Sequence, residues 1–303
     1  MLQRLNFHAM GCEILALIDH DIEAPMLKQV PIWFEEWEQI LSRFRTNSEL
    51  TRLNMIHDQP IQVSDTLWDV FGAAQKAEQM TNGLVTPTLL DAILEAGYDR
   101  PFDNLTPQTS FKLDSVITTT QPLTAILANE SNQTLTLPFG MGLDFGGVAK
   151  GWAAHQAMLR LQAEGPVLID AAGDIAISGR RADGNPWKIG VANPFKQNEE
   201  LEVLNLNSNG VATSGKDRRR WLRNGILQHH IIDPLTGEPA ETDLLTVTVI
   251  APDVMQAEAA AKAAFILGSH AGLEWVESHP ELAGLLILDN GEMLYSTNME
   301  KYL

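Results

Sequence analysis

The sequence has a single cysteine, no apolar segment ahead of it and no long apolar run, and each of these shortages excludes a class of protein. Cys12 cannot form an internal disulfide, and we expect a buried structural thiol there rather than a catalytic or lipidated one. The residues before Cys12 include Arg4, Asn6 and His8 and do not predict a signal sequence. No stretch approaches the roughly 18 apolar residues that span a bilayer. We therefore expect a cytoplasmic protein without a membrane segment.

Positive charge is also scarce. The chain has 21 Lys+Arg and 39 Asp+Glu, so its net charge is 21 − 39 = −18. Such a charge argues against nucleic acid or an anionic membrane as a partner. An anionic ligand would need a local cluster of positive charge or a metal ion. With 303 residues, the chain is long enough for one large domain or two medium ones.

The order of apolar runs and turn residues predicts an α+β fold of mostly antiparallel sheets with packed helices. We predict a single domain over residues 1–303. If the chain forms two subdomains, the proline-containing connection 99–122 is where we expect their boundary. Ser48 and Ser64 are predicted N-caps of helices, and Asn82-Gly83 is a predicted helix stop.

The predicted elements follow from the spacing of apolar residues and from the glycine, asparagine and proline residues that separate the apolar runs. Helices are predicted at Pro25–Phe44, from Ser64 to Asn82, at Thr88–Ala96, Val148–Gln162 and Asp253–Leu267, and near Ala271–Ser278. Leu5–Asp19 is predicted to be one strand with a bulge or bend at Gly11. Further strands are predicted at Leu123–Ala128, Thr134–Leu137, Pro166–Asp170, Asp174–Ser178, Trp187–Val191, Leu201–Leu206, Gly210–Thr213, His229–Ile232, Thr246–Ile250, Gly284–Leu288 and Glu292–Tyr295.

A glycine-rich stretch from Gly140 to Ala154 is the most distinctive motif. Its glycines allow a ligand to approach the backbone, and the alanine-rich run that follows predicts a helix. The N–H groups of a helix start suit a phosphate, and Lys150 would add a full charge. The motif is neither a P-loop nor a dinucleotide fingerprint, because Val148 follows Gly147 and a third glycine is missing. A tight turn into a packed helix is the alternative interpretation.

Two further stretches carry polar side chains suited to a ligand. The run Lys216–Arg220 concentrates basic residues where a phosphate would bind; the alternative is a solvated turn paired with surface carboxylates. Asp233-Pro234 and Gly237 predict a hairpin. The neighbouring His229 and His230 would point to opposite faces of a strand, so at most one faces a given site. Histidine suits proton transfer near neutral pH, although a lone strand histidine is more often only hydrogen-bonded.

Glu258 and Lys262 lie one turn apart on a predicted helix. Glutamate preceding lysine at this spacing is typical of an exposed ion pair that contributes about 0.3 kcal/mol. We expect that exposed pair here. The alanines around it predict close packing against another backbone.

Taken together and in order, these stretches resemble the ApbE family of FAD:protein FMN transferases. The segments that carry the resemblance are His8–Gly11, Ser42–Asn54, Leu143–Trp152, Asp170–Ile175, Thr213–Gly215 and His230–Gly237. The resemblance implies that FAD is bound and that its FMN half is moved to a threonine of a client protein, releasing AMP. Some members of the family instead hydrolyse FAD to FMN and AMP. A carrier that binds FAD without transfer, and a scaffold with an empty cleft, are the alternative functions.

The resemblance also implies roles for individual residues. His230 and Asp144 are the implied catalytic residues, and either could be the base. The implied FAD contacts are Met10, Gly11, Asp144, Gly146, Gly147, Lys150, Ser214, Gly215, Arg218, His230, Asp233 and Thr236.

The family's magnesium site is altered in this sequence. The resemblance implies a site made by an aspartate, a threonine or serine four residues on, and a main-chain oxygen near the glycine motif. The matching positions are Glu258, Lys262 and Gly147. A protonated lysine is a poor metal ligand, so we expect its ammonium where magnesium would bind, held by Glu258. Thr86 and His155 likewise stand where the family has aspartates.

Overall fold

The computed structural model describes residues 1–105 and 120–303. They form two compact units. The first comprises Met1–Glu35, Lys150–Asp217 and Thr242–Leu303, and the second comprises Glu36–Ala149 and Arg218–Glu241. The predicted connection 99–122 falls within the range of the second unit rather than at a division, and its residues 106–119 lie outside the described residues. The prediction of a single domain stays a prediction.

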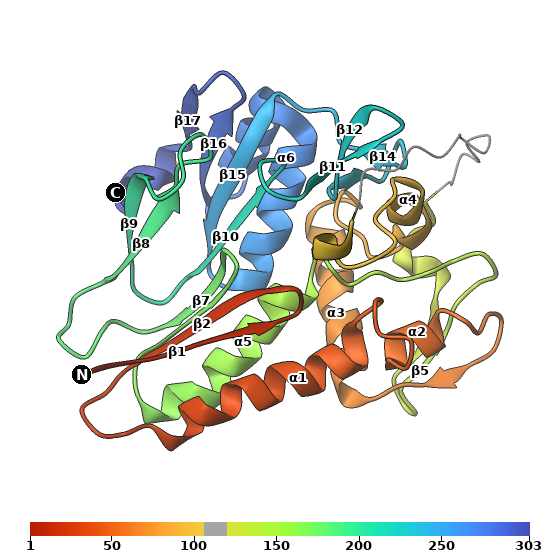
Figure 1. The fold of residues 1–303 in the computed structure, drawn as a ribbon, viewed down its shortest axis with the longest axis horizontal. Helices are drawn as coiled ribbons and strands as arrows, with labels where there is room; N and C mark the ends of the chain where they lie inside the picture. Colours follow the sequence, from red (N-terminus) through yellow and green to blue (C-terminus); the bar gives the residue numbers. More distant parts are fainter. Residues whose placement is uncertain (106–119) are drawn as a thin grey trace. The chain divides into compact units, whose positions relative to one another are not determined.

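The first unit is built on an eight-stranded sheet in the order β1-β2-β6-β7-β10-β15-β16-β17, shown in Figure 1. Every pairing in it is antiparallel, and the α+β class is confirmed. The strands are β1 Leu2–Ala9, β2 Cys12–Asp19, β6 Val167–Ala171, β7 Asp174–Ser178, β10 Gly210–Gly215, β15 Leu244–Ala251, β16 Ala283–Leu288 and β17 Met293–Tyr295.

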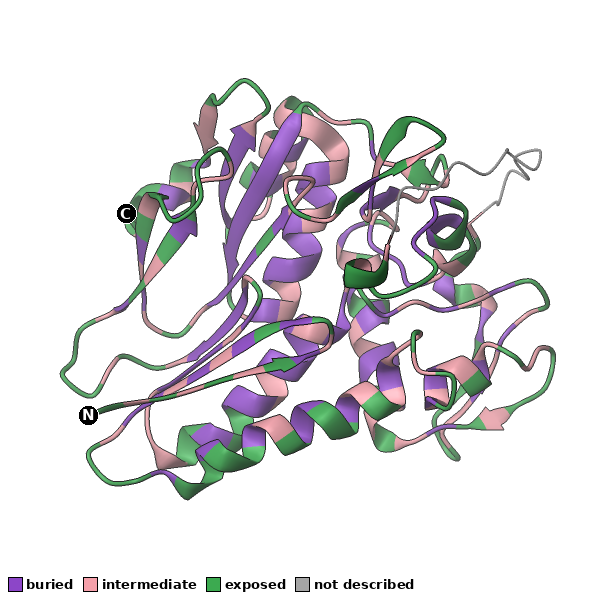
Figure 2. Cartoon of the chain, viewed as in Figure 1, coloured by how far each residue is buried: buried purple, intermediate pink, exposed green. Residues whose placement is uncertain are grey.

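Both faces of this sheet are covered. All eight residues of the central strand β15 are buried, as Figure 2 shows. On one face, the two-stranded ribbon of β8 (Trp187–Ala192) and β9 (Glu200–Leu206) and the 3₁₀ segment η5 (Thr297–Lys301) contribute to an apolar core. That core includes Leu168, Ile177, Trp187, Leu204, Leu206, Val211, Leu285, Ile287 and Met299. Complete burial explains why β15 is apolar at nearly every position instead of alternating.

The helix α6 (Val254–Glu277) packs against the same sheet, mainly on β10 and β15. Its N-cap is Asp253, whose carboxylate accepts the N–H of Gln256 at 2.9 Å. Gly268 has φ 81° and breaks the helix, which accounts for the two separate helices that the sequence predicts. A Cβ on Gly210 of β10 would lie 2.0 Å from the backbone nitrogen of Val254. Only glycine permits this approach. The alanines of α6 are buried, and their close packing against another backbone stays a prediction.

The N-terminal segment forms a hairpin instead of one bent strand. Ala9 of β1 pairs with Cys12 of β2, which leaves a two-residue turn. Met10 and Gly11 in that turn have φ of 51° and 67°, as in the type I′ turns that join twisted strands. The prediction of a single strand with a bend at Gly11 is therefore wrong. The prediction of a buried Cys12 is confirmed.

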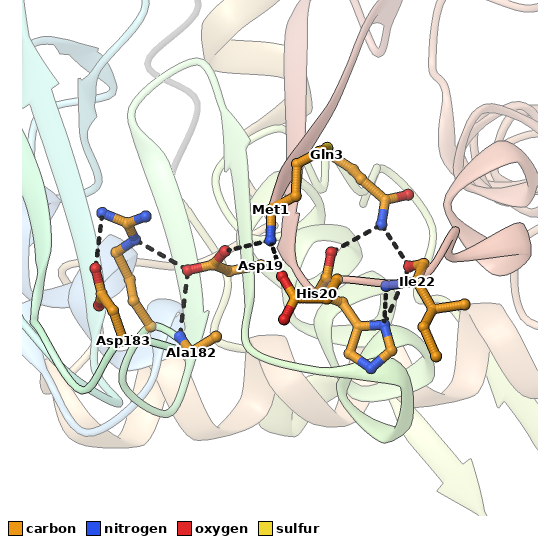
Figure 3. Close-up of polar contacts among 9 residues, drawn as sticks. Met1, Gln3, Asp19, His20, Ile22, Ala182 and Asp183 are labelled. Atoms are coloured by element: carbon orange, nitrogen blue, oxygen red, sulfur yellow. Dashed lines mark hydrogen bonds and ion pairs between the residues drawn. The ribbon is translucent and has the colours of Figure 1, made fainter.

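A buried carboxylate ties this hairpin to the loop after β7. Asp19, the last residue of β2, accepts a hydrogen bond from Arg181 Nε at 3.1 Å and from the N–H of Ala182 at 3.2 Å (Figure 3). The amine of Met1 lies 3.7 Å from the other carboxylate oxygen. The end of the hairpin is thus fixed by charge as well as by strand pairing.

The second unit contains short helices whose starts the sequence predicts. They are α2 (Glu49–Leu53), α3 (Asp65–Met80) and α4 (Leu90–Glu95). Ser48 Oγ accepts the N–H of Thr51 at 3.0 Å, and Ser64 Oγ accepts that of Leu67 at 3.3 Å. Both predicted caps are confirmed, and α3 ends before Asn82 as predicted. The helix α1 (Val30–Leu41) crosses the division between the units, and α5 (Ala149–Leu161) begins at it.

The strands of the second unit are short. Three of them, β3 (Ile61–Gln62), β5 (Thr134–Thr136) and β4 (Leu127–Asn129), form one small sheet. The predicted strand Leu123–Ala128 begins as a 3₁₀ turn, Leu123–Ala125. The other strands form two hairpins: β11 (Arg220–Arg223) with β12 (Ile226–His229), and β13 (Ile232–Asp233) with β14 (Glu238–Pro239).

The predicted strand His229–Ile232 is divided between these hairpins. His229 ends β12, His230 lies in a bend, and Ile232 begins β13. The sequence prediction of one continuous strand is wrong, because His229 pairs with β11 whereas Ile232 pairs with β14 in a different hairpin. The turn of the β11–β12 hairpin is Asn224-Gly225, with φ of 51° and 77°. Asn-Gly between strand formers is the signal that would have revealed it. Among the helices of the described residues, none is long and apolar enough to cross a membrane.

Candidate active site

Lys150, in the first turn of α5, lies against two buried carboxylates. Its Nζ contacts Asp174 Oδ2 at the start of β7 and is 3.5 Å from Glu258 Oε1 on α6. The side chains of Lys150, Asp174 and Glu258 are 16%, 4% and 1% exposed. Burial alone would lower the pKa of Lys150, but the two carboxylates outweigh it and raise that pKa above its usual value. Lys150 is therefore a fixed cation.

Lys262 completes the group, which we call the charge cluster: Lys150, Asp174, Glu258 and Lys262. Lys262 Nζ donates to Glu258 Oε1 at 2.9 Å, and the N–H of Gly151 donates to Glu258 Oε2 at 3.1 Å. Burial and the neighbouring Asp174 raise the pKa of Glu258, whereas the two lysines oppose that shift.

The sequence predicts an exposed ion pair between Glu258 and Lys262, and the prediction of exposure is wrong. The pair forms, but Glu258 is buried. The reason is local packing: a Cβ at position 151 would lie 2.5 Å from Glu258 Oε2, so glycine lets the carboxylate reach the first turn of α5. One N–H group of that helix start, predicted to suit a phosphate, is thus hydrogen-bonded to a carboxylate of the chain itself.

The charge cluster does not fit a magnesium ion. Both oxygens of Glu258 already accept hydrogen bonds, from Lys262 and from Gly151. A protonated lysine offers no lone pair, whereas magnesium requires a near-octahedral set of oxygen ligands. Within residues 1–105 and 120–303, no group of three or more His, Cys, Asp or Glu side chains could hold a metal ion.

The remaining predicted FAD residues of the first unit lie in strands or their turns. Met10 and Gly11 form the β1–β2 turn, and Ser214 is buried in β10 opposite Val247. A Cβ on Gly215 would lie 2.7 Å from the carbonyl oxygen of Leu245, so this glycine has a packing requirement of its own.

Lys216, from the predicted basic run, is paired within the first unit. Its Nζ donates to the carbonyl of Thr242 at 2.6 Å and to Asp289 Oδ2 at 2.8 Å. For Lys216 the structure therefore matches the alternative of a basic turn paired with a carboxylate. Arg218, Arg219 and Arg220 belong to the second unit.

Asp144, in the second unit, is held on both carboxylate oxygens. Its Oδ2 lies 2.9 Å from Arg43 Nε, and its Oδ1 accepts the N–H of Gly146 at 2.7 Å. The backbone N–H of Asp144 donates to the carbonyl of Pro87 at 2.8 Å. The glycine loop is thus a tight turn organised around Asp144.

Sequence reasoning missed Arg43 as the partner of Asp144. The Arg43 guanidinium lies 4.0 Å from the ring centre of Phe44 and 4.7 Å from that of Tyr98. Tyr98 packs against Trp221 of β11 at 5.3 Å between ring centres, and burial raises the Tyr98 pKa. Arg43 lies within the segment Ser42–Asn54 that resembles the family, which was the one available signal.

The two adjacent histidines differ in their surroundings. His229 is buried, with Nε2 3.1 Å from the carbonyl oxygen of Ala240 and Nδ1 accepting the N–H of Ile231 at 3.3 Å. This pattern fits a structural histidine whose proton is on Nε2. His230 is half-buried in the bend that follows.

The predicted hairpin at Asp233 is confirmed. The Asp233 carbonyl accepts the N–H of Gly237 at 2.8 Å, and its carboxylate accepts that of Leu235 at 2.8 Å. Thr236 is exposed in the same turn. The structure thus brings Asp233 together with Thr236, Asp144 with Gly146, and Lys150 with Glu258 and Lys262.

A model of the ApbE family matches residues 10–286. The chain belongs to the ApbE family. Two relatives bear the name FAD:protein FMN transferase: a Haemophilus influenzae protein is 29% identical over 87% of this chain and 79% of its own length, and an Escherichia coli K12 protein is 28% identical over 91% and 80%.

Solved structures of ApbE proteins share the fold. The crystal structure of the ApbE protein of Thermotoga maritima aligns with a TM-score of 0.89 at 24% identity, covering 100% of this chain and 99% of that one. The flavin transferase ApbE of Vibrio cholerae aligns with a TM-score of 0.82 at 22% identity, covering 100% and 99%. At these identities the likeness establishes the fold alone.

Proposed function

We propose that this ApbE-family chain is an FAD:protein FMN transferase. The observation that carries the proposal is the family match over residues 10–286, together with relatives of that name aligned over about nine-tenths of the chain. The proposed substrates are FAD and a client protein whose acceptor residue is a threonine.

The reaction proposed is a displacement at phosphorus. The threonine Oγ bonds to the phosphorus on the FMN side, the bond to the bridging oxygen breaks, and AMP leaves. The threonine proton passes to a base of the protein. Because charge develops on phosphoryl oxygens, fixed cations and N–H donors would lower the barrier.

The proposed FAD contacts are those that the family resemblance implies. Lys150 supports this assignment because its two carboxylate partners keep it charged. The residues proposed to bind FAD are Met10, Gly11, Asp144, Gly146, Gly147, Lys150, Ser214, Gly215, Arg218, His230, Asp233 and Thr236.

His230 is the residue proposed to take the threonine proton. Asp144 is less suited, since Arg43 and the Gly146 N–H already occupy its two oxygens. We assign Asp144 to positioning the glycine loop. Under this division, His230→Gln should lower the rate of transfer by about 10²–10⁴, a larger factor than its loss of FAD affinity.

Transfer can be tested with extracts of Escherichia coli cells that lack their own FAD:protein FMN transferase. The purified chain is incubated with FAD and the extract, and proteins are separated under denaturing conditions. We expect fluorescent bands whose peptides carry one FMN on a threonine, and AMP in equal amount. The His230→Gln protein is the matched control.

The outcomes separate the alternative functions. FAD binding without covalent flavin would favour a carrier, and release of FMN and AMP without protein labelling would favour a hydrolase. A purified chain that neither binds FAD nor labels protein would contradict the proposed function.

A further inference from the structure

The charge cluster contains a partly buried ammonium, that of Lys262. The Lys262 side chain is 15% exposed, and its Nζ donates to Glu258 at 2.9 Å. Within the described parts of the chain, this is the single hydrogen bond of an ammonium that has three N–H donors. A partly buried cation with N–H donors that are not bonded to the described chain is suited to an anionic ligand.

The cluster also balances its own charge without a metal ion. Lys150 and Lys262 oppose Asp174 and Glu258, and the lysines lie 3.5 and 2.9 Å from the same Glu258 oxygen. A divalent ion entering here would have to displace an ammonium from Glu258.

We propose that the Lys262 ammonium takes the place of a divalent cation, so that this chain binds the diphosphate of FAD without magnesium. This inference rests on the proposed function for the identity of the ligand. Glu258 positions the ammonium, as a carboxylate would position the ion. Lysine supplies one positive charge where magnesium supplies two, and it needs no metal to be recruited from solution.

FAD affinity of the wild-type chain provides the first test. FAD is titrated by flavin fluorescence in EDTA and again with excess magnesium chloride. We expect the dissociation constants for FAD in EDTA and in magnesium chloride to agree within about twofold. A magnesium-dependent gain of about tenfold or more in the wild-type chain would overturn the inference.

Two variants at position 262 provide the second test. In EDTA, Lys262→Thr and Lys262→Met should both bind FAD about tenfold more weakly. Magnesium should restore binding to Lys262→Thr, which offers a hydroxyl oxygen beside Glu258, but not to Lys262→Met. Unchanged FAD affinity in both variants would mean that Lys262 forms a structural ion pair only, and would also overturn the inference.

A third measurement does not depend on FAD. Manganese(II) alone is titrated into each protein and followed by its electron paramagnetic resonance signal. We expect no binding to the wild-type chain and binding to Lys262→Thr. If the wild-type chain binds no FAD, the proposed function fails, whereas manganese bound by the wild-type cluster contradicts the inference itself. Should Lys262→Thr fail to fold, the wild-type titrations still decide.

Discussion

Lys150, Asp174 and Glu258 show what buried charge requires at the scale of single residues. Each side chain is largely removed from water, and each has an opposite charge within 4 Å. Desolvating an ion costs several kcal/mol, so such groups persist only when their partners stay in place. Removal of one partner should therefore cost more than the interaction itself contributes.

The first prediction concerns Lys150→Met. The change leaves two neighbouring carboxylates buried with only Lys262 to compensate them, and should reduce the free energy of unfolding by about 3–5 kcal/mol. Urea denaturation measures this loss. The matched control is Lys196→Met, which removes an exposed pair with Glu199 and should cost no more than about 0.5 kcal/mol. Equal losses in the two variants would show that burial of the cluster is unimportant.

The second prediction concerns pH and His155 on α5. Burial lowers the pKa of His155 below 6.5, and the Asp253 carboxylate opposes only part of that effect. Among the residues described, His155 Nδ1 is buried without a hydrogen-bond partner. The unfolded chain therefore binds a proton more readily, so the stability due to neutral His155 is present above pH 6.5 and is lost as pH falls through the folded-state pKa.

Urea denaturation of wild type and His155→Gln at several pH values measures this effect. The variant should lose less stability between about pH 6.5 and 5. His270→Gln, at an exposed position, is the matched control for the loss of a histidine. A His155→Gln profile that parallels wild type would contradict the prediction.

At the scale of elements, α5 and α6 approach each other through Gly151. Replacing glycine by alanine inside a helix usually stabilises it by about 1 kcal/mol. At position 151 the added Cβ would meet Glu258 Oε2 at 2.5 Å, so Gly151→Ala should instead destabilise the protein, by about 1–3 kcal/mol.

Gly72 in the middle of α3 is the matched control for Gly151. A Cβ there meets nothing within 4 Å, so Gly72→Ala should stabilise by about 1 kcal/mol. Thermal and urea unfolding of the two variants should thus shift in opposite directions. Stabilisation by both substitutions would show that the Glu258 carboxylate does not require glycine at this helix start.

Elements whose ends depend on residues nearby in the sequence could be predicted. Elements that depend on pairing with another segment of the chain could not. Ser48 and Ser64 cap their helices through N–H groups three residues away. The alanine-rich run likewise located α5, and apolar runs between turn residues located most strands of the large sheet. The sequence does not predict the β1–β2 hairpin, because apolar residues continue on both sides of Met10-Gly11.

The candidate site was predictable to a similar extent. Motif order located Asp144, Lys150 and Glu258, but their partners come from distant parts of the chain. Arg43 reaches Asp144, and Asp174 reaches Lys150, only after folding. The spacing of Glu258 and Lys262 predicts their ion pair correctly, yet spacing carries no information on burial, which depends on what packs over that face of the helix.

At the scale of the whole molecule, the net charge of −18 opposes the approach of any anion. FAD carries a diphosphate, so the proposed substrate must approach against this field before it meets local cations such as Arg218. Salt screens interactions between solvent-exposed charges beyond about 8 Å at physiological ionic strength. As the salt concentration rises, the long-range repulsion between the chain and FAD should therefore weaken first. Short-range contacts at a buried site should weaken later.

The last prediction is that FAD associates faster as ionic strength rises. Stopped-flow measurements of flavin fluorescence should give an association rate constant that increases about two- to fivefold between roughly 10 and 150 mM ionic strength. Sodium chloride and sodium sulfate at equal ionic strength should act alike if screening is the cause, since a competing anion would instead slow binding. A rate constant that falls with salt would show that the arginines near position 218 dominate the field that FAD encounters. In that case local attraction, rather than the net charge of the chain, would govern how the substrate approaches.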